Sequence, residues 1–226
     1  IHHVCTMALN PREANDDRVN ADVLAVLPRY LEKDGVVGVG EIGLDDQTPT
    51  EERFFLAQLD LAKAHGLPIL IHTPHRDKKR GFERCIAMIK DAGFPFERIL
   101  LDHGNEETIR LTRELGCVSG FSLYPFTKMD VPRMVEVIRE YGFDRIVVNS
   151  AADWGISDPL MVPKLVQALL RGLLDGRLTS IEAFDGDRLL LDVTPPADEK
   201  SAIPAPAMAA RPPAEIASNE ELFLNG

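Results

Sequence analysis

Six short apolar runs, each separated from the next by a helical stretch, constrain the fold of this chain more than any other feature. The runs are rich in β-branched residues and mostly lack alternation, and they cover residues 3–9, 36–43, 67–72, 98–103, 117–123 and 144–150. Such runs are typical of strands that are covered on both faces. The helical stretches between them fall near residues 19–33, 50–65, 80–92, 106–115, 130–141 and 160–174.

Strands that alternate with helices, without a hairpin signal, predict an α/β fold with a parallel sheet. A doubly wound sheet and a (β/α)8 TIM-type barrel both accommodate this pattern, and a chain of 226 residues is long enough for one large domain of either kind. Within the pattern, Thr50 precedes the acids Glu51 and Glu52, which predicts that Thr50 is the N-cap of its helix.

The last part of the chain has a different composition. Residues 195–226 are rich in proline and alanine, which predicts a disordered tail after a domain at residues 1–194.

The net charge of −11 limits the expected partners. It disfavours a basic groove for nucleic acid, although divalent metals at a site would reverse the local field. We therefore expect a small-molecule substrate. The chain has no apolar run long enough to span a membrane, and its three cysteines lie far apart, which is typical of a reduced cytoplasmic protein.

Several of the apolar runs end in a side chain that can bind a metal. Glu41, His72 and His103 belong to three successive runs and are separated by 31 residues in both intervals, and Asp153 follows the last run. One strand–helix repeat takes about 30 residues, so these side chains should reach the same edge of the sheet. In parallel α/β folds this edge forms the active site, most consistently in barrels. A set of carboxylates and imidazoles there predicts a site for Zn, Mn, Fe or Co.

The segments "VVGVGEIGLD", "LPILIHTP", "ILLDHGNEET" and "RIVVNSAADWG" together resemble the TatD-type metal-dependent hydrolases of the amidohydrolase superfamily. The resemblance implies a TIM-type barrel that holds one or two divalent ions, such as Zn, Mn, Fe or Mg. It implies that Glu41 bridges two metals and that His72 and His103 complete the shell of the second. Asp153 would bind the first metal and handle the proton of the attacking water.

The chain departs from the family pattern in two places. The H-x-H motif of the family's first strand is absent, so we expect a fragment that lacks about the first two strand–helix units of the barrel. After the last strand the chain has "NSA" where relatives usually have "ETD". Asp153 is the expected acid there, and Asp158 is the alternative.

Residues near the same edge are candidates for substrate binding. His75 and Arg76 lie just beyond His72, Asn10 ends the first run, and Trp154 follows Asp153. Asp45 is a candidate for orienting a metal ligand, and the alternative is that it faces solvent.

The resulting prediction is a hydrolase that uses metal-activated water on a small phosphoester, amide or ester, with Glu41 and Asp153 as catalytic residues. Alternatives are a non-hydrolytic isomerase or lyase on the same barrel and a degenerate, non-catalytic barrel. A nucleotide site is disfavoured, because the glycines of the G-x-G-x-x-G match in "GVGEIG" fall inside a strand instead of at a strand-to-helix turn.

Overall fold

The computed structural model describes residues 3–124, 128–151, 157–174, 181–185 and 188–193. The chain divides into two compact units, Ile1–Leu178 and Thr179–Gly226.

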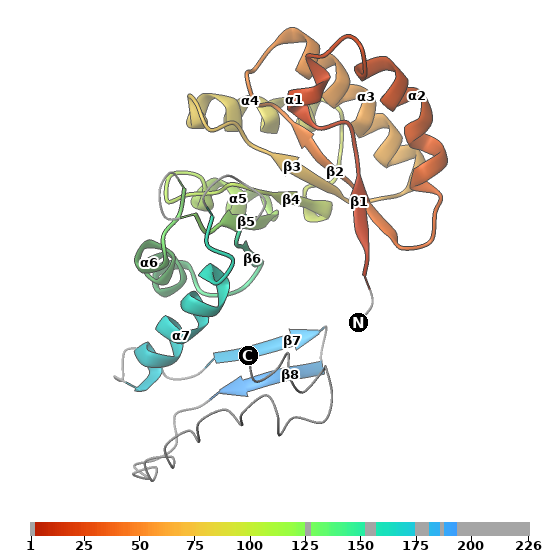
Figure 1. Ribbon diagram of the computed structural model, residues 1–226. Coiled ribbons are helices and arrows are strands. Elements are labelled where there is room, and N and C mark those ends of the chain that lie inside the picture. Colours follow the sequence, from red (N-terminus) through yellow and green to blue (C-terminus); the bar gives the residue numbers. More distant parts are fainter. Residues whose placement is uncertain (1–2, 125–127, 152–156, 175–180, 186–187, 194–226) are drawn as a thin grey trace, which may run out of the picture. The chain divides into compact units, whose positions relative to one another are not determined.

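The first unit is built on a six-stranded parallel sheet whose strands follow one another in chain order (Figure 1). The strands are β1 (Cys5–Met7), β2 (Val36–Gly43), β3 (Ile69–His72), β4 (Ile99–Leu101), β5 (Val118–Ser122) and β6 (Ile146–Asn149). Each predicted apolar run contains one of them, so the α/β class and the parallel sheet are confirmed. A doubly wound sheet reverses its strand order at a switch point. The unbroken order found here is that of consecutive strands in a TIM-type barrel.

Helices connect the strands of this sheet. They are α1 (Pro11–Ala14), α2 (Asn20–Leu31), α3 (Pro49–His65), α4 (Lys78–Asp91), the 3-10 helix η1 (Phe96–Arg98), α5 (Ile109–Leu115), α6 (Val131–Tyr141) and α7 (Met161–Leu174). The six predicted helices are all present, and α1 and η1 were not predicted. In the described part of the chain, no helix combines the length and the apolar character that a membrane crossing requires.

The core lies between the central strands and the helices that cover them. The strands contribute buried apolar residues that pack with buried residues of α2, α3 and α4 in one cluster: Val39, Ile42, Ile69, Ile71, Ile99 and Leu101. Glu41 and His72, at the carboxyl ends of β2 and β3, are outside this cluster and line the pocket described below.

The N-terminus of α3 differs from its prediction. The helix begins at Pro49, and its N-cap is Thr48, whose hydroxyl accepts a hydrogen bond from the Glu51 amide at 3.1 Å. Thr50 therefore lies inside the first turn, and its prediction as N-cap was wrong. Two sequence features favour the observed start: Thr48 and Glu51 are spaced as in a capping box, and proline is preferred at the first helical position.

Two glycines of "GVGEIG" allow β2 to approach β3 closely. A Cβ atom at Gly40 would lie 2.4 Å from the Leu70 Cβ, and one at Gly43 would lie 2.3 Å from the His72 carbonyl oxygen. Gly43 also has a φ of +137°, which residues with a side chain rarely adopt. Both glycines are therefore explained by strand packing around Glu41.

The second unit contains an antiparallel hairpin of β7 (Ile181–Asp185) and β8 (Arg188–Val193). The sequence analysis found no hairpin signal, so this hairpin was not predicted. The domain boundaries at residues 1–194 and 195–226 stay predictions, and residues 194–226 lie outside the described part.

Gln58 of α3 provides a test of the packing between β1 and its covering helix. Its buried amide accepts a hydrogen bond from the Leu9 N–H at 2.6 Å and donates to the Leu9 carbonyl at 3.0 Å. Gln58→Leu would leave both groups buried without these partners, at about 1–3 kcal/mol for each. We expect the free energy of unfolding, measured by denaturant titration, to fall accordingly. Gln167→Leu, at an exposed position of α7, is the control and should change it by less than about 0.5 kcal/mol.

Candidate metal centre

Three successive strands bring Glu41, His72 and His103 into contact. The Glu41 carboxylate lies 3.2 Å from Nδ1 of His72 and 3.1 Å from Nε2 of His103, and these two ring nitrogens are 3.1 Å apart. One ligand atom from each residue lies within 4.8 Å of the others. A carboxylate oxygen and two imidazole nitrogens that converge in this way fit a divalent ion such as Zn, Mn or Fe. Asn10 extends the group, since its amide donates to Glu41 Oε2 at 3.5 Å.

Asp45 contacts the ring nitrogen of His72 that faces away from Glu41. Its Oδ1 lies 3.2 Å from Nε2 of His72, on the side of the ring opposite Glu41, and its Oδ2 accepts from Arg12 Nε at 2.9 Å. A carboxylate in this position keeps a proton on Nε2 and leaves Nδ1 free to act as a ligand. The structure therefore places Asp45 where the sequence analysis expected an orienting residue.

His103 is held by a different set of groups. Its Nδ1 lies 2.7 Å from Ser122 Oγ and 3.3 Å from Lys128 Nζ, and its backbone N–H donates to Asp102 Oδ1 at 2.7 Å. His103 also has a φ of +60°, in the left-handed region that residues with a side chain seldom occupy. Strained residues of this kind cluster at functional sites, where surrounding contacts hold them in place.

The charges of the centre depend on one another. Burial raises the pKa of Glu41, but hydrogen bonds from His103 and His72 outweigh it and hold this pKa well below its usual range. The hydrogen bond from His72, followed by that from Arg12, also lowers the pKa of Asp45. Burial lowers the pKa of His72, but the bonds to Asp45 and Glu41 raise it to about 9. Without a metal, His72 is therefore a cation between two carboxylates at neutral pH.

The centre opens into a pocket of about 810 Å³. Three predicted substrate-binding residues, Asn10, His75 and Arg76, line it together with Glu41, His72 and His103. The predicted Asp153 and Trp154 lie outside the described residues. Asp158, the alternative acid, does not line the pocket. It pairs with Lys164 and accepts from the Leu160 amide at 2.9 Å near the start of α7.

The pocket also contains residues that the sequence analysis did not select. Asp102, Ser122 and Lys128 contact His103 or its backbone, and Thr73 follows His72. Position relative to a strand end could have identified Asp102 and Ser122, because one precedes a predicted ligand and the other ends the next strand. Lys128 lies in a loop between β5 and α6, where no spacing rule applies.

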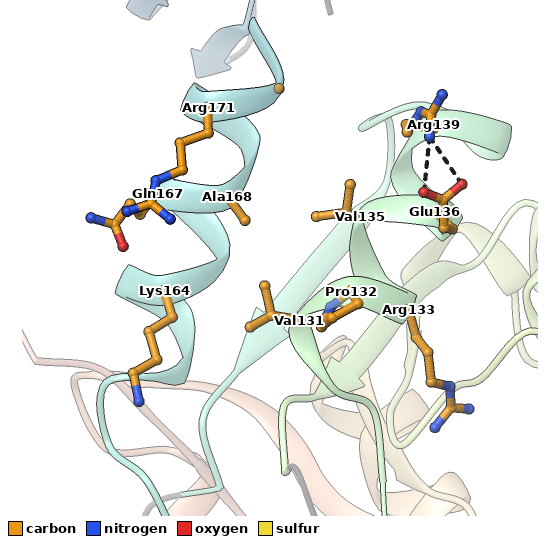
Figure 2. A pocket seen from close by; sticks show the side chains of 11 residues that line it. Val131, Pro132, Arg133, Val135, Glu136, Arg139, Lys164, Gln167, Ala168 and Arg171 are labelled. Atoms are coloured by element: carbon orange, nitrogen blue, oxygen red, sulfur yellow. Dashed lines mark hydrogen bonds and ion pairs between the residues drawn. The ribbon is translucent and has the colours of Figure 1, made fainter. Parts of the chain in front are cut away.

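A second hollow, of about 630 Å³, lies between α6 and α7 (Figure 2). Val131 and Val135 point from α6 toward α7, and Ala168 points back toward them. Three of the cations that line it, Arg133, Arg139 and Lys164, are paired with Glu106, Glu136 and Asp158. This hollow holds none of the predicted site residues, and we assign the chemistry to the metal centre.

Two individual proteins are similar to this chain in sequence or in fold. The chain is 31% identical over 115 residues to an uncharacterized metal-dependent hydrolase of Methanocaldococcus jannaschii, a match that covers 51% of this chain and 45% of the relative. A solved TatD-like protein from Archaeoglobus fulgidus has a TM-score of 0.55 and 25% identity, with 75% of this chain and 66% of that chain covered. The chain thus spans less than two thirds of the length of either.

A solved phosphotriesterase homology protein from Escherichia coli, with phosphate in its active site, shares the fold. Its TM-score is 0.51 at 19% identity, and the match covers 65% of this chain and 60% of that one.

Residues 2–165, well over half of the chain, match the sequence profile of a family described as TatD-related DNases. The resemblance noted in the sequence is therefore confirmed, and the chain belongs to the TatD-related DNase family.

Proposed function

We propose that this chain carries the metal centre of a divalent-metal-dependent hydrolase that acts on small phosphoesters. The observation that carries the proposal is the convergence of Glu41, His72 and His103 in the lining of one pocket, with one ligand atom from each within 4.8 Å of the others. Membership of the family and the metal-dependent hydrolase in Methanocaldococcus jannaschii support the same reaction class.

The side chains have distinct roles in this proposal. Glu41 Oε1 and Oε2, His72 Nδ1 and His103 Nε2 are the ligand atoms. Asp45 holds Nε2 of His72, so this imidazole presents the lone pair of Nδ1 to the centre, and Ser122 holds Nδ1 of His103. When bound, a divalent ion polarises the scissile group and lowers the pKa of the attacking water. Asp153 stays the predicted proton acceptor.

Positive charge on one wall of the pocket supports an anionic substrate. Lys128 and Arg76 line the pocket on loops that follow β5 and β3. Burial, and after it the charge of Lys128, lowers the pKa of the neighbouring Lys78 to about 8. In a chain of net charge −11, such a wall fits a phosphoryl group better than a neutral amide or ester. A small substrate, and not long DNA, stays the prediction, as does a cytoplasmic location.

The first prediction concerns metal binding and activity together. Glu41→Gln keeps the shape of the side chain and removes the charge that offsets a divalent ion. We expect metal bound per chain, measured by elemental analysis after dialysis, to fall, and phosphoester hydrolysis with Mn or Zn to drop at least about 100-fold. Glu52→Gln, on the surface of α3, is the control. Full activity in Glu41→Gln would contradict the proposal, and hydrolysis of amides alone would favour that substrate class.

The second prediction concerns pH. Nδ1 of His72 must lose its proton before it can act as a ligand, and the pKa of about 9 means that protons compete with the metal below that pH. The apparent metal affinity should therefore rise with pH between 6 and 9, by up to about tenfold per unit. Calorimetric titrations in buffers of different ionisation enthalpy should show proton release at pH 7. An affinity that does not change with pH would contradict this assignment.

The third prediction concerns Lys128. Lys128→Met removes the ammonium group but keeps most of the aliphatic stem. We expect KM for a phosphomonoester to rise about tenfold or more. Inhibition by inorganic phosphate should weaken in parallel. Lys79→Met, in α4 outside the pocket lining, is the matched control. Unchanged KM and phosphate inhibition in Lys128→Met would remove the argument for an anionic substrate.

A further inference from the structure

Glu51, in the first turn of α3, is a buried carboxylate that the metal centre does not contact. Only 1% of its surface is exposed. Its Oε2 accepts hydrogen bonds from the backbone N–H groups of Asp45 at 2.9 Å and Gln47 at 2.8 Å, and its Oε1 accepts from that of Asp46 at 3.0 Å. Three consecutive amides therefore point at one side chain.

This arrangement is an extended form of a capping box. In the usual box, the glutamate three residues after the N-cap bonds to the N-cap amide. Here Thr48 caps the Glu51 amide, and the Glu51 side chain reaches past the N-cap to the three residues before it. The positive end of the helix dipole and the three N–H groups all favour a negative charge at this point.

Glu51 also joins the loops that present pocket residues. The Asn15 side chain, at the end of α1, donates to Glu51 Oε1 at 2.6 Å and accepts from the Thr48 hydroxyl at 2.6 Å. The loop after β1 therefore has a direct bond to Glu51. Gln47 continues the chain of bonds in the other direction, because its side chain donates to the Arg76 carbonyl at 3.1 Å.

We propose that Glu51 is a positioning residue of the metal centre, which acts through Asp45. The loop from Leu44 to Gln47 has no strand or helix of its own to fix its path, and Glu51 holds three of its amides. The same loop carries the Asp45 carboxylate, 3.2 Å from His72 Nε2. Glu51 thereby sets the direction in which His72 presents Nδ1 to Glu41 and His103. This inference rests on the proposed metal centre for its functional meaning.

A neutral amide cannot replace the carboxylate here. Glu51→Gln leaves one oxygen for four donors, and its own NH₂ group would face backbone N–H groups. We expect the folded, metal-free variant to bind Zn or Co about 10- to 100-fold more weakly than the wild type. Losses of this size are typical when a group that holds a metal-binding side chain in place is removed. The control is Glu52→Gln, its sequence neighbour, which pairs with Arg84 at the surface and should change the affinity less than twofold.

A double-mutant cycle separates this role from a general loss of stability. If Glu51 acts through Asp45, then Asp45→Asn alone weakens metal binding, and adding Glu51→Gln weakens it little further. Losses that multiply in the double variant would overturn the proposal. So would a folded Glu51→Gln variant with wild-type affinity. If Glu51→Gln does not fold, Asn15→Ala removes one donor to the same carboxylate and should give a smaller loss in the same direction; wild-type affinity in that variant would also overturn it.

A metal-free measurement distinguishes failure of this inference from failure of the proposed function. In NMR spectra of the metal-free chain, the ring signals of His72 should shift in Glu51→Gln and not in Glu52→Gln. The amide protons of residues 45–47 should lose protection from exchange in the same variant. Absence of metal binding in the wild type would refute the metal centre. Unchanged His72 signals in Glu51→Gln would refute the positioning role, whatever the metal result.

Discussion

Parallel pairing of consecutive strands, without a reversal of order, is the constraint on which the rest of this structure depends. It brings the carboxyl ends of all the strands to one edge of the sheet, so residues one repeat apart in sequence become neighbours in space. Asn10, Glu41, His72 and His103 form a series with intervals of 31 residues, and each member contacts another member at this edge. The regular length of the strand–helix unit thus determines which side chains meet.

The protonation of Glu41 and His72 depends on the contacts that the strand ends bring about. Strand packing places a carboxylate against two imidazoles in a partly buried setting, and each group changes the protonation of the others. Asp45 contacts His72 and Lys128 contacts His103, so groups of opposite charge both line the pocket.

The sequence predicted the features that periodicity and strand ends determine. These include the six strands of the sheet, the helices between them, and the placement of Glu41, His72 and His103 together. Features that depend on loop conformation were not predicted. Lys128 reaches His103 from an irregular loop, and the contact between Asp45 and His72 was expected only as a general role.

Local competition explains the remaining differences. Thr48 and Thr50 are both reasonable N-caps by residue type, and the capping-box spacing of Thr48 and Glu51 with Pro49 at the first helical position favours Thr48. The β7–β8 hairpin follows six strand–helix units, and the continued apolar pattern gave no sign that the strand direction would alternate there.

The loop after "GVGEIG" binds a carboxylate through the backbone amides of residues 45–47. Its three amides form a concave anion site of the kind that binds phosphate in nucleotide-binding proteins, but the chain fills that site with its own glutamate. An incoming diphosphate would have to displace a carboxylate of the same chain that already accepts from all three amides. An internal ligand therefore occupies these amides, and their binding capacity, which other proteins keep for cofactors, stabilises the loop instead.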